Sequence, residues 1–511
     1  MTFDDIKYNP KQGNFINTLA KNPRWEKITQ TPFKPHITTI TLLCAPLLLI
    51  ATLSIICPIA AIIVSLATIT IVVFIIKPET PYYLLTILHH FGFFFFNFYM
   101  PHEKVTFIAS ELFMIIIPLL WLLSRSINTA TPYFGTVWDI PLLLFWGLSL
   151  LSLVWTVDLL NGSMQLLVLS FSFIVYFVVT LSTINNHNKL NIVIWLVIIL
   201  GILDSIICLL SVFSKYSYPD YIQSQLINYK NFEITLFFNF LGKRGHAFNH
   251  PITTAFFLNF ALMLSFGKFL TTKGNKKIAI SIITFLMLTA HLTTLSKAPL
   301  LALIGGVVFM FYFIRPTRKA FFLAITILLI VLITSFVLAN ITDLKNTMRY
   351  TTHQVTGYDE NSSTTSRMNW WMQSIEKSVE NYGFGVGIGG IQKYLRPPAP
   401  HSHNAFVGAF GDLGFIGLGL LLLIYIFAFK SYFDTFIKCR NEYYRRILLT
   451  YIGGFITLII TALLTLNYTM DSLWWYMGFG YVIINIAKKV PPDFMDNDLP
   501  FFKEKKSICT I

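Results

Sequence analysis

The sequence has few charged residues and few cysteines. Only 12% of its 511 residues are charged, whereas 55% are hydrophobic, and an ordinary soluble domain carries about 25% charged residues. This composition excludes an ordinary soluble protein. The five cysteines show no paired spacing such as C-x-x-C, so we expect neither a disulfide nor a zinc site. The first 36 residues are polar and many apolar runs follow, so we expect no cleaved secretory signal.

Long apolar runs dominate the chain instead. A transmembrane helix needs about 20 mostly apolar residues, and fourteen runs approach that length. They lie near 38–56, 58–76, 82–99, 105–123, 138–156, 163–182, 190–213, 246–266, 277–295, 297–314, 319–339, 404–428, 446–467 and 472–487. The run 82–99 is among the weakest because His89 and His90 interrupt it. We predict an all-α, polytopic transmembrane helix bundle of about 12–14 spans, with an even number favoured.

The positive charges indicate how the chain is oriented. The net charge is +14, but the basic residues lie in short clusters between apolar runs, so we expect no nucleic acid partner. Clusters within 268–277, 315–319 and 430–446 should be cytoplasmic by the positive-inside rule, and both termini then lie inside. The predicted regions are a cytoplasmic segment 1–37, spans within 38–339 with an outer loop near 214–245, an outer loop 340–403, spans within 404–487 and a cytoplasmic tail 488–511.

The longer outer segment contains a predicted amphipathic helix, and function should be sought on this outer side. Its apolar residues recur at the spacing of one helical face, and Ser362, Ser363 or Thr364 can serve as N-cap. They are Met368, Trp371, Met372, Ile375 and Val379. Such a helix can lie on the membrane surface or close over a cavity.

Three cations on the predicted outer side are candidates for binding an anion. Arg244 and His250 stand where an outer loop enters an apolar run, and Pro251 suits the first turn of the helix that follows. Lys297 lies in the tight outer turn after Ser296, and Arg367 opens the amphipathic helix. The alternative is that these side chains extend to lipid headgroups or to water.

The glycine run GFGVGIGG at 383–390 places Gly385, Gly387 and Gly390 in G-x-G-x-x-G spacing. A nucleotide fold is rejected because the run follows a helix and the outer segment has no room for a βαβ unit. A flexible hinge is the favoured interpretation, and a nest of backbone N–H groups for an anion is the alternative.

Two histidines precede the next apolar run. His401 and His403 lie where the long outer loop re-enters the membrane, and an imidazole there can take or orient a proton near neutral pH. On a helix beginning near His403, one face carries a stripe that narrows to glycine and permits close helix approach. The stripe is Phe406, Val407, Phe410, Gly411 and Gly414. A metal site at His-Ser-His is not favoured, because these loops hold no carboxylate or thiol cluster.

These motifs resemble a known family. His403-Asn404, nine residues and then Gly414-Phe415-Ile416-Gly417 is similar to the H-N/S/Q-x9-G signature of bacterial O-antigen ligases and of the wider polymerase and ligase group. Arg244-Gly245, Ser296-Lys297 and Arg367 occur in the order of that group's other short motifs, over about residues 240–420. Lys297 departs from the arginine common after that serine, and lysine acts on phosphate as a point charge.

The resemblance implies a C-type membrane glycosyltransferase that moves a glycan from undecaprenyl diphosphate to lipid A-core on the periplasmic face of the bacterial inner membrane. It implies His403, Arg367 and Arg244 as catalytic residues. It implies that the protein contacts its glycan donor, its lipid A-core acceptor and membrane lipids, and that it needs no metal or other cofactor. The substrate-binding candidates that it implies are Lys297, His401, Asn404, His250, Gly385 and Gly387. Alternatives of the same family are an O-antigen polymerase and a protein O-oligosaccharyltransferase. A transporter or flippase is the alternative of another class, with Asp204 and Glu111 as proton relays.

Overall fold

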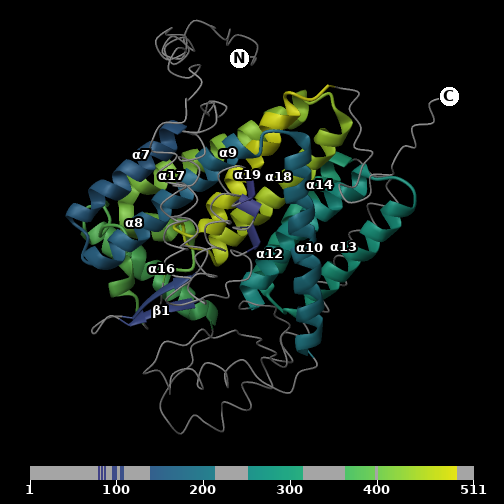
Figure 1. Cartoon of the computed structure of the whole chain (residues 1–511). Helices are drawn as coiled ribbons and strands as arrows, with labels where there is room; N and C mark the ends of the chain where they lie inside the picture. The colour runs from purple at the N-terminus through teal and green to yellow at the C-terminus, as the bar shows by residue number, and fades with distance from the viewer. Residues whose placement is uncertain are drawn as a thin grey trace, which may run out of the picture. The chain divides into compact units, whose positions relative to one another are not determined.

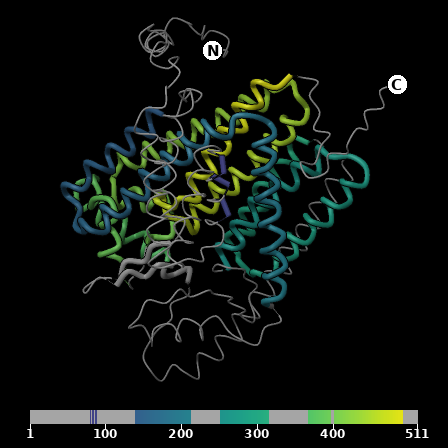
Figure 2. The backbone as a smooth tube through the Cα atoms, in the orientation of Figure 1, coloured from purple at the N-terminus to yellow at the C-terminus, as the bar shows by residue number. Residues whose placement is uncertain are grey.

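The computed structural model describes residues 79–80, 82–83, 86–87, 95–99, 104–108, 139–212, 251–314, 363–396 and 401–491. All of them except 79–80 belong to one compact unit, which comprises Pro81–Ile117 and Tyr133–Ile511 (Figures 1 and 2). The described part of this unit is helical apart from one small hairpin.

Short stretches of other helix types interrupt the described α-helices. Ile174–Val179 is a π-helical stretch between α8 and α9, and single turns of 3-10 helix occur at Ser152–Val154 and Ile391–Tyr394. The α-helices are α7 (Asp139–Leu151), α8 (Leu159–Phe173), α9 (Thr180–Thr183), α10 (His187–Val212), α12 (Pro251–Thr271), α13 (Asn275–Thr293), α14 (Lys297–Ile314), α16 (Ser363–Glu380), α17 (Ala405–Lys438), α18 (Glu442–Leu464) and α19 (Asp471–Ala487).

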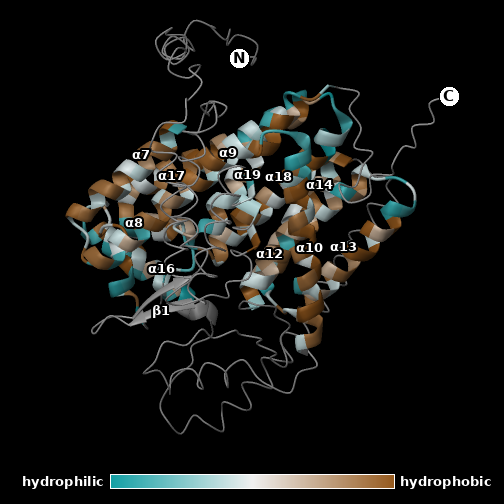
Figure 3. Cartoon of the chain, viewed as in Figure 1, coloured by the Kyte–Doolittle hydropathy of each residue, from teal (hydrophilic) through white to brown (hydrophobic). Residues whose placement is uncertain are grey.

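Seven helical segments of the described residues are long and apolar enough to cross a membrane. Each of them overlaps one of the predicted runs, and Figure 3 shows how hydrophobic residues dominate these helices. The protein is therefore an all-α, multi-pass membrane protein, as its composition indicates. The predicted total of 12–14 spans stays a prediction, because the runs at 38–56, 58–76 and 319–339 lie outside the described residues.

The prediction that 82–99 and 105–123 are two spanning helices is wrong where the two runs meet. Phe95–Tyr99 forms strand β1 and Lys104–Ile108 forms strand β2, and the two pair antiparallel with Asn97 opposite Thr106. Phenylalanine, tyrosine, valine and threonine favour strands, and Pro101 between the strands cannot continue a helix. Hydrophobicity alone does not distinguish such a hairpin from two helix ends.

Close approach of backbones fixes the direction of the central helices. A Cβ added to Gly306 of α14 would overlap the Gly453 carbonyl of α18, and one added to Gly305 would overlap Ile460. Residue numbers therefore fall along α14 as they rise along α18, so the two helices are antiparallel. Consequently α14 begins, at Lys297, at the end of the bundle where α18 finishes.

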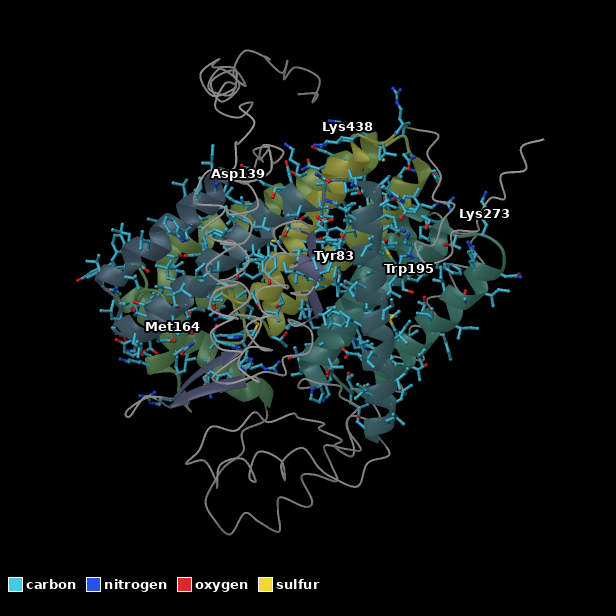
Figure 4. All side chains as sticks on the ribbon, viewed as in Figure 1. Tyr83, Asp139, Met164, Trp195, Lys273 and Lys438 are labelled. Atoms are coloured by element: carbon cyan, nitrogen blue, oxygen red, sulfur yellow. The ribbon has the colours of Figure 1, made fainter. Side chains whose placement is uncertain are left out.

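The opposite end of the bundle gathers basic residues. The Arg446 guanidinium of α18 donates to the Leu270 carbonyl of α12, which brings together the clusters within 268–277 and 430–446. Figure 4 labels Lys273 and Lys438 from these two clusters. The sequence prediction that both clusters face one side of the membrane agrees with this contact.

Helix α17 is broken near its start. Gly414 has φ 68° and ψ −161°, outside the helical region. The rings of Phe406 and Tyr425 are 5.3 Å apart, whereas 19 residues of straight helix (425 − 406) would separate their Cα atoms by about 28 Å. The segment before Gly414 therefore folds back against the segment after it, and the predicted run 404–428 is not one straight helix.

Candidate functional site

The site is built around the start of α17. Asn404 is the N-cap, and its Oδ1 accepts hydrogen bonds from the backbone N–H groups of Phe406 and Val407, each at 3.0 Å. This cap explains why the helix begins here, since the first N–H groups of a helix have no partner inside it. A contact between Asn404 and substrate stays a prediction.

His403 lies directly before this cap in an unusual backbone conformation. Its φ is +54°, in the left-handed region that histidine enters more often than most residues. Its backbone N–H donates to Nδ1 of His401 over 3.1 Å. Its ring stacks on Trp370 with 5.3 Å between centroids and 27° between planes, and meets the ring of His401 edge-on at 4.2 Å. The loop therefore fixes the direction of the imidazole.

Helix α16 supplies the other side of the site. The Trp371 indole N–H donates to the Ser402 carbonyl over 2.9 Å, which ties α16 to the histidine loop. Nη1 of Arg367 donates to the Leu464 carbonyl over 3.2 Å, at the carboxyl end of α18. That carbonyl is negatively polarised because it stands at the end of a helix dipole. Arg367 is thereby held beside the two histidines.

Burial and this arginine depress the pKa of both imidazoles. Burial lowers the pKa of His401 to about 4, and the positive charge of Arg367 contributes to the shift. Burial lowers the pKa of His403 to about 3, with further contributions from His401 and Arg367. Burial also lowers the pKa of the Arg367 guanidinium. Both histidines are consequently neutral at neutral pH and can accept a hydrogen bond from a hydroxyl group.

Of the other basic residues predicted for the site, the structure describes Lys297. Lys297 is exposed at the first turn of α14, at the same end of the bundle as Leu464 and therefore as Arg367. Arg244 and His250 lie outside the described residues. Two of the three cations proposed for a diphosphate thus belong to one end of the molecule.

The glycine run is an ordered loop that packs against other segments of the chain. Four of its glycines have φ between 70° and 88°, a backbone conformation that residues other than glycine rarely adopt. They are Gly383, Gly385, Gly387 and Gly389. The N–H of Gly387 donates to the Asp412 carbonyl over 2.8 Å, and the N–H of Ile388 donates to Oγ of Ser152 over 3.0 Å. These bonds favour a structural role over the expected hinge. A contact of Gly385 or Gly387 with substrate stays a prediction.

The sequence interpretation missed Asp412. This aspartate is 2% exposed inside α17. Its carboxylate accepts hydrogen bonds from the Ile391 N–H at 2.9 Å and from the Tyr468 hydroxyl at 2.8 Å. It thereby joins the glycine loop and the loop after α18 to the helix that begins at the site. The available signal was an acidic residue inside an apolar run, which is costly in a membrane and marks a specific role.

The two residues named for a transporter are described only in part. Asp204 is buried in α10 at 1% exposure, and Glu111 lies outside the described residues. Within the described residues no group of three or more His, Cys, Asp or Glu side chains could hold a metal ion.

Comparison with known proteins supports the resemblance in this region. Residues 282–422 match the family model described as O-antigen ligase. The matched segment contains Lys297, Arg367, the glycine run, both histidines and Asn404, whereas Arg244 and His250 precede it. No curated protein matches the sequence.

One similar solved chain comes from the work described as "Structural coordination of polymerization and crosslinking by a peptidoglycan synthase complex". Its identity to this chain is 14%, with a TM-score of 0.39, and the match covers 69% of this chain and 97% of the other. At this TM-score the likeness supports no conclusion about fold or function.

Proposed function

We propose that this protein is an O-antigen ligase-like glycosyltransferase. It transfers a polysaccharide from undecaprenyl diphosphate to lipid A-core on the periplasmic face of the bacterial inner membrane. The observation that carries the proposal is the cluster of His403, His401, Trp370 and Arg367, which α16 and the start of α17 bring together inside the segment that matches the family.

In this scheme His403 acts on the acceptor hydroxyl. The hydroxyl oxygen forms a bond to the anomeric carbon of the donor, the bond from that carbon to the diphosphate oxygen breaks, and the hydroxyl proton must leave. The neutral imidazole accepts a hydrogen bond from the hydroxyl and orients it. A diphosphate beside Arg367 would offset its positive charge, so donor binding should raise the pKa of His403 and make it a better proton acceptor.

The cations act on the leaving group. Arg367 uses one of its five N–H donors for the Leu464 carbonyl in this structure, and an arginine can present a pair of donors to phosphate oxygens. Lys297 adds a point charge at the same end of the bundle, and Arg244 is the third candidate. Charge that develops on the diphosphate is stabilised by these groups, so the scheme needs neither a metal nor a nucleotide.

Two relatives of this reaction are the nearest alternatives. A polymerase must hold two lipid diphosphates and should therefore present two separate cationic sites. A ligase needs one such site and an opening for an amphipathic acceptor. Arg367 and Lys297 share one end of the bundle, which favours the ligase. A protein O-oligosaccharyltransferase would use a serine or threonine hydroxyl in the same position.

Deletion of the gene distinguishes these activities. For a ligase, lipid A-core should lack polysaccharide while long chains accumulate on the lipid carrier, and a plasmid copy of the wild-type gene should restore transfer. Core that carries a single repeat unit would identify a polymerase. Unchanged lipopolysaccharide with an unglycosylated pilin would identify the protein-modifying enzyme. If the attachment of polysaccharide to lipid A-core, the length of its chains and the glycosylation of pilin were all unchanged, the proposal would be contradicted.

A further inference from the structure

Helix α16 presents an apolar stripe that stays exposed among the described residues. Four side chains at the spacing of one helical face are exposed: Met368 by 57%, Met372 by 65%, Ile375 by 38% and Val379 by 57%. At 100° per residue these positions fall within a sector of about 60°. A soluble helix would bury such a stripe against the core.

The face that α16 turns toward the protein is polar and aromatic instead. Ser374 and Ser378 are fully buried, and Oγ of Ser378 donates to the Phe410 carbonyl over 2.8 Å. Trp371 and Arg367 bond to the histidine loop and to α18 from the same side. The helix therefore cannot turn its apolar stripe inward without breaking the contacts that form the site.

The exposed side of α16 carries a charged stripe next to the apolar one. Asn369, Glu376 and Glu380 are exposed and occupy the sector beside the apolar stripe. A helix surrounded by lipid would not carry two exposed glutamates, and one surrounded by water gains nothing from four exposed apolar residues. A helix that lies in the plane of the membrane interface has this division, with an apolar stripe toward the acyl chains and a charged stripe toward water.

We propose that the apolar stripe of α16 is inserted into the interface of the lipid bilayer. The stripe is continuous with a surface that must face lipid. Exposed Phe384 follows the helix, the Gly383 carbonyl accepts the N–H of Phe415, and Phe415 and Ile416 are exposed at the start of the long spanning segment of α17. The bilayer is therefore the occupant, and α16 is not a lid that closes over a cavity.

Insertion of α16 would set the depth of the site. Arg367 and Trp370 are carried on the same rigid helix, on the side away from the apolar stripe. They would lie at headgroup level, where the phosphates of any membrane-anchored diphosphate also lie. This consequence rests on the proposed function, whereas the insertion itself does not.

Depth can be measured without any assay of activity. The full chain, with its five native cysteines replaced by serine, is reconstituted in nanodiscs of phosphatidylethanolamine and phosphatidylglycerol. M372C and E380C, which lie about 80° apart around the helix, are each labelled with the same small fluorophore. Quenching by lipid that bears a nitroxide near the top of its acyl chain should be about threefold stronger at position 372 than at position 380, and aqueous iodide should show the reverse order.

Two other outcomes would overturn the proposal. Strong iodide quenching at both positions would place the stripe in water. Energy transfer between labels at position 372 on different chains, lost on dilution with unlabelled protein, would make a second copy the occupant. V379E should weaken lipid quenching at position 372, while the control N369E, which adds the same charge to the charged stripe, should leave it unchanged. Thermal melting of each variant checks that it is folded.

Discussion

The position of the His403 imidazole depends on its backbone as much as on its side chain. The residue has φ at +54°, and its ring lies against the rings of Trp370 and His401. A residue other than glycine in this left-handed region carries about 1 kcal/mol or more of backbone strain, and such strain persists where surrounding contacts hold the conformation. Here the holding contacts are the His401 Nδ1 acceptor and the Asn404 cap.

Substitutions at His403 should separate its chemistry from its conformation. H403N should fold, because asparagine tolerates the left-handed region, yet lose at least about a hundredfold in transfer rate, the scale of a general base. H401N should be milder, because His401 positions the loop through one hydrogen bond. H403V should lower the melting temperature, since a branched side chain is strained there. Transfer by purified H403N near the wild-type rate would remove the proposed role.

The depressed pKa values predict an unusual pH profile. A histidine with an ordinary pKa near 6.5 would become protonated below that pH and stop accepting a hydrogen bond. Because the pKa of His403 is about 3 and that of His401 about 4, both stay neutral well below pH 6.5. The ratio kcat/KM, which reports the free enzyme, should show no loss from these groups between pH 7.5 and about pH 5.

Arg367 provides the control for this profile. Its positive charge contributes to the low pKa of His403, although burial is the larger cause. In R367Q the pKa of His403 should rise modestly, so the acidic limb of kcat/KM should begin at higher pH than in the wild type, beside an overall loss of rate. A wild-type inflection near pH 6.5 that disappears in H403N would contradict the assignment.

At the scale of elements, α17 shows what sequence could and could not predict. Hydrophobic runs predicted the spanning helices because their signal is local, and the 3-4 spacing predicted α16. The break at Gly414 was not predicted, because it depends on a contact with Gly383, whose carbonyl a Cβ at 414 would overlap. Similarly, the sequence placed His403 and Arg367 on one outer face, but only the fold of α16 against α17 brings their side chains together.

The glycine run offers a test of its structural role. Gly387 has φ 88°, and a Cβ there would overlap the backbone of Thr156. G387A should therefore cost about 2–4 kcal/mol of stability, from strain together with lost packing. Gly419, in the spanning segment of α17, has open space around its missing Cβ, so G419A should be neutral or stabilising by up to about 1 kcal/mol. Melting temperatures in one detergent compare the two variants, and equal values would show that the run is as tolerant as a flexible hinge.

At the scale of the whole molecule, the two ends of the bundle have different character. One end joins the basic clusters through Arg446 and Leu270. The other end holds the carboxyl end of α18, Arg367 and the histidine loop. The positive-inside rule assigns the basic end to the cytoplasm, so the cluster at His403 should face the periplasm.

Cysteine labelling in intact cells tests this orientation. In a variant whose five native cysteines are serine, E376C places a thiol on the charged stripe of α16 and K273C places one in the basic turn between α12 and α13, and both positions are exposed. An impermeant maleimide added to cells with a permeabilised outer membrane should label E376C, while K273C should react only after the inner membrane is opened. The reverse pattern would move His403 and Arg367 to the cytoplasmic side, where the donor proposed above is not presented, and would overturn the proposed reaction together with the topology.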